Sequence, residues 1–145
     1  MAIEAVDVIS VKQQVERVMR DVPSSHGFAK DGFGHVQIGA EYALFLSIQE
    51  RFNPMLGQVT FLIHDIRWWD GLERRARRIN INTQGLEGRE SGRDILSKLA
   101  VSGRMNEDEF TQALEAIEKH SLLPNQDLQP RALSQIIRDA DRSTR

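Results

Sequence analysis

Residues 53–66 read NPMLGQVTFLIHDI, and this stretch decides the fold. Asn53 is a favourable residue at a helix N-cap, and Pro54 suits the first helical position because an N–H there has no partner within the helix. The turns that follow are apolar nearly all round, which is typical of a buried helix. We therefore expect a central helix over Pro54–Ile66. A strand over Val59–Ile63 is the alternative, but no second β segment is evident to pair with it.

Helical spacing of apolar residues predicts further helices on both sides of this one. The expected ranges are Ile3–Asp21, Gly34 or His35 to Phe52, Leu72–Ile79, Glu90–Val101, Asn106–His120, and a last helix from about Pro130. The repeating face of the second helix is marked by Ile38, Tyr42, Phe45, Leu46 and Gln49, and that of the last helix by Leu133, Ile136, Ile137 and Ala140. Residues 22–33 hold Pro23 and two glycines and predict a loop. Gly103 is expected to end the helix over Glu90–Val101, and Asn106 with Glu109 resembles a capping box.

Length and composition agree with one all-α domain over residues 1–145, a helical bundle of five to seven helices. The chain is 40% hydrophobic and 28% charged, as in ordinary globular proteins, and its net charge is −2. That balance gives no indication of general nucleic-acid or membrane binding. No apolar run approaches the ~20 residues that span a bilayer. The N-terminus does not resemble a signal peptide, and we expect a cytoplasmic protein. The sequence has no cysteine, which excludes thiolate metal sites.

Four side chains on or beside the predicted helices carry the chemistry: His35, His64, Asp65 and Asp141. His64 and Asp65 directly follow an apolar run, where two adjacent ionisable groups are costly unless they are paired or bind a metal. Two imidazoles and two carboxylates can hold one divalent ion. Each residue also has a plainer interpretation. An isolated histidine at a helix start is more often a surface or capping residue, and Asp141 alone would be a solvated charge.

Four motifs in this order resemble the HD-domain family of metal-dependent phosphohydrolases. They are HVQIGAEYA at residues 35–43, FLIHDI at 61–66, AIEKHS at 116–121 and IIRDADR at 136–142. The resemblance covers about Gly32–Arg142. It implies an HD-like helical bundle, an enzyme that hydrolyses a phosphomonoester or nucleotide, and a bound divalent cation.

By that resemblance His35, His64, Asp65 and Asp141 are the metal ligands, with Asp139 as the rival for the last position. A nitrogen and oxygen ligand set suits Mn, Mg, Co, Ni or Fe. The catalytic assignments are Asp65 or another nearby carboxylate for proton transfer from water, Arg67 for phosphate contact and His120 as a site-lining residue or proton donor. For His120 the alternative is a helix C-terminal residue that favours the dipole.

The sequence departs from the family at three places. Where some members carry an acidic pair after the doublet, this chain has Trp68 and Trp69, which disfavours the guanosine tetraphosphate hydrolase branch. The middle region, residues 88–92, has no histidine for a second metal, so a mononuclear site is expected. The sequence ends four residues after Asp141, at Arg145. The family usually continues with further helices, so either the chain is truncated or the substrate pocket lacks a wall.

These departures favour an alternative function, a catalytically inactive HD-like regulatory or nucleotide-binding module. Six arginines between positions 74 and 93 could cover a polyanionic substrate or simply form a solvated surface. The pair Trp68 and Trp69 could stack on a nucleobase, although packing beneath a loop is the commoner role. A third possibility is an all-α interaction protein without a metal. The sequence does not identify the substrate, the metal or the oligomeric state.

Overall fold

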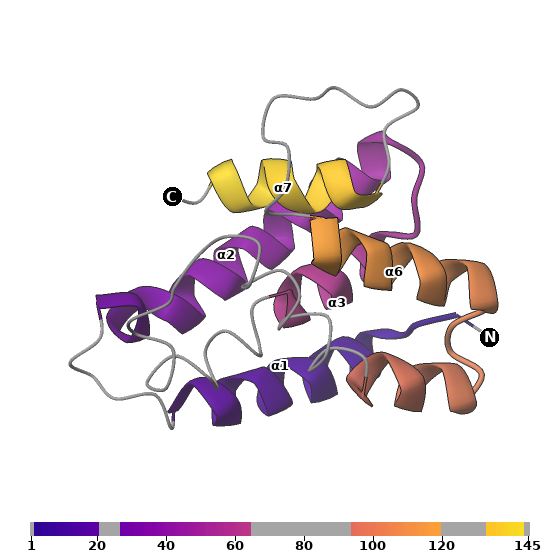
Figure 1. Ribbon diagram of the computed structural model, residues 1–145, viewed down its shortest axis with the longest axis horizontal. Helices are drawn as coiled ribbons and strands as arrows, with labels where there is room; N and C mark the ends of the chain where they lie inside the picture. Colours follow the sequence, from indigo (N-terminus) through magenta and orange to yellow (C-terminus); the bar gives the residue numbers. More distant parts are fainter. Residues whose placement is uncertain (1, 21–26, 65–93, 120–132, 144–145) are drawn as a thin grey trace.

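The computed structural model describes residues 2–20, 27–64, 94–119 and 133–143 of the 145-residue chain (Figure 1). These parts contain six helical segments and no strand, so the all-α prediction is confirmed for them and the strand alternative is wrong. The helices are α1 (Ala5–Arg20), α2 (Gly27–Gln49), α3 (Pro54–Ile63), a helix over residues 94–101, α6 (Glu107–Lys119) and α7 (Leu133–Ser143).

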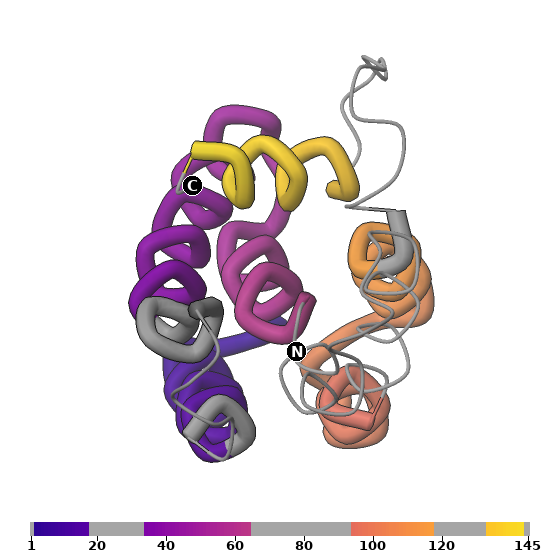
Figure 2. The backbone as a smooth tube through the Cα atoms, turned by 60° about the vertical axis from the view of Figure 1, so that its left-hand side comes forward, coloured from indigo at the N-terminus to yellow at the C-terminus, as the bar shows by residue number. Residues whose placement is uncertain are grey.

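Helix α3 lies at the centre of the bundle, and α1, α2, α6 and α7 surround and contact it (Figure 2). Its residues from Val59 to Ile63 are almost completely buried. The predicted central helix is therefore confirmed. It ends at Ile63, with His64 as its C-cap, and the predicted last turn over residues 65–66 lies outside the described residues.

The N-terminus of α3 is capped as the sequence predicts and is tied to the start of α6. The side-chain oxygen of Asn53 accepts from the N–H of Met55 at 3.1 Å, and Pro54 follows the cap. The Asn53 amide donates to Glu109 at 3.2 Å. Glu109 also closes a reciprocal capping box with Asn106 through bonds of 3.1 and 2.8 Å. One carboxylate therefore connects two helix N-termini.

Helix α2 packs on α3 through small residues rather than large ones. Its buried positions are Val36, Gly39, Ala40, Ala43 and Ser47. The large residues of the predicted repeating face lie elsewhere: Ile38 and Phe45 are 54% and 58% exposed, Tyr42 is also exposed, and only Leu46 packs partly against the core. The repeating face that the periodicity predicted is therefore largely exposed. A different face of α2 packs on α3, because a close approach between two helices selects small side chains.

The start of α2 differs from the prediction. Residues 27–33 are helical, although the sequence predicts a loop over 22–33 and a helix start at Gly34 or His35. Glycines in a helix interior cost about 1 kcal/mol each relative to alanine, which is why they indicated a loop. Extending a helix that is already formed gains a hydrogen bond per residue, so local glycine cost need not end it. Residues 22–26 lie outside the described residues.

Helix α2 ends at Gln49, three residues before the predicted end at Phe52. Arg51 adopts a left-handed conformation with φ 62°. The N–H of Arg51 donates to the carbonyl of Ile48 at 3.2 Å, and the N–H of Phe52 donates to that of Ser47 at 2.9 Å. This is a Schellman motif with arginine at the position that glycine usually occupies.

The helix over residues 94–101 ends in a second Schellman motif, at the predicted Gly103. Its φ is 79°, its N–H donates to the Ala100 carbonyl, and the N–H of Arg104 donates to the Leu99 carbonyl. The side chain of Arg104 then pairs with Glu4 at 3.2 Å. This ion pair joins the end of the helix to the residue before α1.

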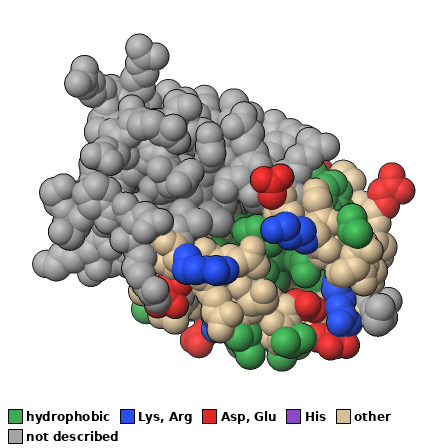
Figure 3. All heavy atoms as spheres, turned by 90° about the horizontal axis from the view of Figure 1, so that it is seen from below, with side chains coloured by type: hydrophobic (Ala, Val, Ile, Leu, Met, Phe, Trp, Pro, Cys, Tyr) green, Lys and Arg blue, Asp and Glu red, His purple; other side chains and the backbone are tan. Residues whose placement is uncertain are grey.

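The face of the molecule seen from below in Figure 1 carries mixed charges. Figure 3 shows acidic, basic and apolar side chains interspersed over its described part.

Within the described ranges, no helix combines the length and apolar character needed to cross a bilayer.

Helix α7 lies across α2, α3 and α6 and supplies the last side of the core. The four residues predicted to form its inward face are buried, namely Leu133, Ile136, Ile137 and Ala140. The first described residue of this helix is Leu133. Three predicted features lie outside the described residues: the helix start near Pro130, the helix over Leu72–Ile79, and residues 90–93 of the helix over Glu90–Val101.

Candidate metal centre

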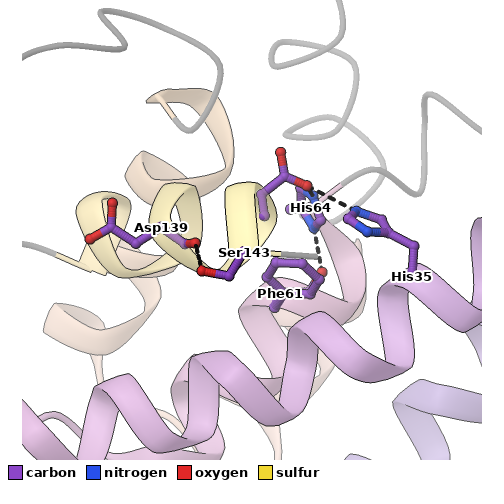
Figure 4. Close-up of polar contacts among 6 residues, drawn as sticks. His35, Phe61, His64, Asp139 and Ser143 are labelled. Carbon is purple, nitrogen blue, oxygen red and sulfur yellow. Dashed lines mark hydrogen bonds and ion pairs between the residues drawn. The ribbon is translucent and has the colours of Figure 1, made fainter. Parts of the chain in front are cut away.

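Three helices bring together His35, His64 and Asp141. His35 lies on α2, His64 caps the end of α3, and Asp141 lies on α7. Figure 4 shows both histidines at the point where these helices meet. One potential ligand atom from each residue lies within 4.8 Å of the other two. Because α2, α3 and α7 all contact one another, the packing of the bundle brings together residues that are 106 positions apart.

His64 is held in one orientation by the backbone of α3. Its side chain is completely buried, and its Nδ1 lies within hydrogen-bond distance of the carbonyl oxygen of Phe61. A carbonyl oxygen can only accept, so Nδ1 is the nitrogen that carries the proton. In the neutral imidazole, Nε2 then presents its lone pair toward Asp141, whose Oδ1 lies 3.5 Å away. Metal-bound histidines commonly use this arrangement, in which one nitrogen donates to a carbonyl and the other binds the ion.

Asp141 places the same carboxylate oxygen against both histidines. Its Oδ1 lies 2.9 Å from Nε2 of His35 and 3.5 Å from Nε2 of His64. A divalent ion ~2.1 Å from two ligands holds them ~3.0 Å apart at a right angle and ~3.4 Å apart at the tetrahedral angle. Both spacings to Asp141 match these values, and the shorter one is also a hydrogen bond between His35 and Asp141. The ligand atoms of all three residues lie within 4.8 Å of one another, whereas bonds of ~2.1 Å to one ion allow at most ~4.2 Å between two ligands. The three residues would therefore hold a divalent cation once their side chains close around it.

The cluster is buried on one side and accessible on another. The side chain of His64 is 0% exposed, that of Asp141 is 11% exposed and that of His35 is 18% exposed. A carboxylate so nearly removed from water is costly unless a cation or hydrogen-bond donors compensate it. The partial exposure of His35 gives the cluster an accessible edge.

Phe61 supports both histidines, a role that the sequence analysis missed. Its ring lies 4.3 Å from the His64 ring between centroids, and 6.0 Å from the His35 ring in an edge-to-face arrangement. Gly39, one turn after His35, leaves the space that this ring fills. The available signal was Gly39 itself, because a glycine in the interior of a helical pattern often has a packing reason.

Asp139, the rival to Asp141, lies away from the cluster. Figure 4 shows its side chain on the far side of α7 from the histidines. Its carboxylate accepts from the side-chain amide of Gln135 at 3.3 Å, and its backbone carbonyl accepts from the hydroxyl of Ser143 at 2.9 Å. Of the two carboxylates, Asp141 is therefore the one that the fold brings to the histidines.

The remaining predicted site residues lie outside the described residues. They are Asp65, Arg67 and His120, together with the pair Trp68 and Trp69 and the arginines between positions 74 and 93. Three of the four predicted ligands are thus placed together, while the fourth ligand and the catalytic assignments stay predictions.

No family model, curated protein or solved structure matches the chain. Over the described residues the fold is all-α, and a partly buried His–His–Asp group lies at a junction of three helices.

Proposed function

We propose that this chain is a metal-dependent phosphohydrolase of the HD class, with one divalent cation held by His35, His64, Asp65 and Asp141. The observation that carries the proposal is the convergence of His35, His64 and Asp141 from three helices, with ligand atoms within 4.8 Å of one another. The same three residues lie in the motifs at residues 35–43, 61–66 and 136–142. An HD-like arrangement of the bundle belongs to the same proposal.

The ligand set favours a hard or borderline cation. Two imidazole nitrogens and carboxylate oxygens suit Mn, Mg, Co, Ni or Fe, and the chain contains no cysteine to favour a thiolate site. When bound, the ion supplies Lewis acidity and activates water for attack on a phosphate ester.

The residues of the chain divide the remaining tasks. His64 is held in the tautomer that directs Nε2 to the site by the Phe61 carbonyl. Asp141 supplies negative charge beside both imidazoles at 2.9 and 3.5 Å. The proposal assigns phosphate contact to Arg67, proton transfer from water to Asp65 and proton donation to His120.

The substrate class is a small phosphomonoester or a nucleotide. The partly exposed His35 side chain, at 18%, gives the cluster an accessible edge. A small phosphate group could reach such an edge. We further propose that the protein is cytoplasmic and that its substrate is soluble.

A pair of matched variants on α7 tests the proposal. Asp141→Asn keeps the size of the side chain but removes its charge, and Asp139→Asn makes the same change two residues earlier, away from the histidines. We expect Asp141→Asn to lower Mn²⁺ affinity and turnover of p-nitrophenyl phosphate or a nucleotide by on the order of 100-fold or more. Asp139→Asn should retain both. Calorimetry and a phosphate-release assay measure the two quantities.

The results separate the candidate functions. Equal affinity and turnover in both variants and the wild type would refute the assignment of Asp141. Loss of Mn²⁺ binding in Asp141→Asn without turnover by the wild type on any tested phosphate would favour the inactive HD-like binding module. Absence of Mn²⁺, Mg²⁺, Co²⁺, Ni²⁺ and Fe²⁺ binding by the wild type would leave a helical interaction protein.

A further inference from the structure

Gly39 leaves a space on α2 that the ring of Phe61 fills. A Cβ atom at position 39 would lie 2.1 Å from two atoms of that ring, Cε1 and Cζ, and 3.0 Å from Cε2. Carbon atoms do not approach so closely, so any residue other than glycine would displace the ring. Gly39 lies four residues after His35, which places it one turn further along the same face of α2.

Phe61 contacts the two histidines in different ways. Its ring packs against the His64 ring at 4.3 Å and meets the His35 ring edge to face at 6.0 Å. Its backbone carbonyl accepts from Nδ1 of His64. The ring is completely buried, so it has little room to adopt another position.

We propose that Phe61 is a positioning residue that fixes the separation and orientation of His35 and His64, and that Gly39 is required because it seats the Phe61 ring. The ring sets the space between the two imidazoles, while the carbonyl sets the tautomer of His64. The consequence for metal binding rests on the proposed function, whereas the consequence for the imidazoles does not.

The plainer explanation is that Gly39 only allows α2 and α3 to pack closely. Gly57 provides the matched control for this explanation. Its Cβ would lie 2.1 Å from Oγ of Ser47, so it supports an equally close approach between the same two helices. It lies seven residues before His64, about 10 Å along the helix axis. Gly34 is a second control. It precedes His35 directly in the sequence, but a Cβ atom at position 34 would have no other atom within 4 Å.

Mn²⁺ affinity of the glycine variants is the first test. We expect Gly39→Ala to weaken Mn²⁺ binding by about 10-fold or more, in the range seen when supporting residues of metal ligands are removed. Gly57→Ala and Gly34→Ala should bind Mn²⁺ as the wild type does, within about 2-fold. Circular dichroism establishes that each variant is folded. Equal loss in Gly39→Ala and Gly57→Ala would overturn the proposal in favour of simple helix packing.

A double-mutant cycle identifies the ring as the cause. Phe61→Leu removes the distal ring atoms that a Cβ at position 39 would meet, but it keeps the backbone carbonyl. We therefore expect Phe61→Leu alone to weaken Mn²⁺ binding and the added Gly39→Ala change to cost no more than about 2-fold in that background. If Gly39→Ala fails to fold, Phe61→Leu alone decides, and wild-type affinity in that variant would contradict the proposal.

Nitrogen-15 spectra of the imidazoles supply a readout that needs no metal. The wild type should show His64 with its proton on Nδ1, and Phe61→Leu should retain that signature because the carbonyl remains. Gly39→Ala should alter the His64 and His35 signals, whereas Gly57→Ala should not. Unchanged imidazole signals in Gly39→Ala would reject the positioning role. Wild-type protein that shows these spectra but does not bind Mn²⁺ would reject the proposed function instead.

Discussion

The two ends of the α2–α3 contact are packed alike but differ in the side chains around them. At one end Gly39 faces the ring of Phe61, and at the other Gly57 faces the hydroxyl of Ser47. At the Gly39 end, two histidines and a carboxylate from α7 meet beside the close contact. At the Gly57 end, the neighbouring features are the cap of α3 and the turn that ends α2.

This difference shows what close packing does and does not provide. Both glycines bring the helices together, but only one end receives ionisable side chains from three elements. We therefore expect changes at the Gly39 end to alter metal binding, and changes at the Gly57 end to alter the free energy of unfolding alone.

The largest effect is expected for metal-dependent stability. Mn²⁺ at 100 times its dissociation constant should raise the free energy of unfolding of the wild type by about 2.7 kcal/mol, because it binds only the folded state. Asp141→Asn should lose this gain, and Asp139→Asn should keep it. Urea denaturation with and without Mn²⁺ measures the difference. A gain of equal size in both variants would contradict the assignment of Asp141 as a metal ligand.

Gly57→Ala should lower the free energy of unfolding by about 1–3 kcal/mol, because its Cβ would overlap the hydroxyl of Ser47 in a closely packed core. The double variant Ser47→Ala with Gly57→Ala removes the overlapping oxygen and should recover part of the loss. Denaturation curves measure both effects. A loss of Mn²⁺ affinity in Gly57→Ala would show that the two ends are not independent.

Asn53→Ala should cost about 1 kcal/mol, because the N–H of Met55 loses its side-chain acceptor. Asn53→Ser keeps an acceptor at the cap but loses the donor to Glu109, so it separates the cap from the link to α6. We expect the serine variant to be the more stable of the two in urea denaturation. Both variants lack the amide that donates to Glu109, so a serine variant no more stable than the alanine variant would mean that the side-chain acceptor at the cap contributes nothing.

Arg51→Gly should have the smallest effect, a gain in stability of up to about 1 kcal/mol. Arg51 has φ 62°, where a side chain is strained and glycine is not. Arg51→Ala keeps the Cβ atom and serves as the control, because it removes the charge without relieving the strain. A rise in the urea midpoint for both variants would assign the effect to the arginine side chain rather than to the backbone.

Local rules predicted the parts of the fold that depend on neighbouring residues. The apolar run after Asn53-Pro54 predicted the central helix, and the Asn106–Glu109 capping box and the glycine at position 103 were also correct. Each of these depends on residues within a few positions of one another, so the sequence contains the whole of the required information.

Features that depend on contacts between helices were not predicted. Gly27 and Gly32, the two glycines that indicated a loop over residues 22–33, both lie in α2, and the large apolar residues Ile38 and Phe45 are exposed. The role of Phe61 was also missed, since it depends on a space opposite, at Gly39. His35, His64 and Asp141 were grouped by resemblance to known motifs, because spacing alone does not show which positions of different helices meet. His35, predicted at the start of its helix, lies in the interior of α2.

Anomalous scattering from a crystal grown with Mn²⁺ tests whether His35, His64 and Asp141 bind one divalent cation. We predict a single strong peak within about 2.0–2.3 Å of Nε2 of His35, Nε2 of His64 and an oxygen of Asp141. A well-ordered His35–His64–Asp141 cluster with no peak at millimolar Mn²⁺, or with a peak bound only by other residues, would contradict it.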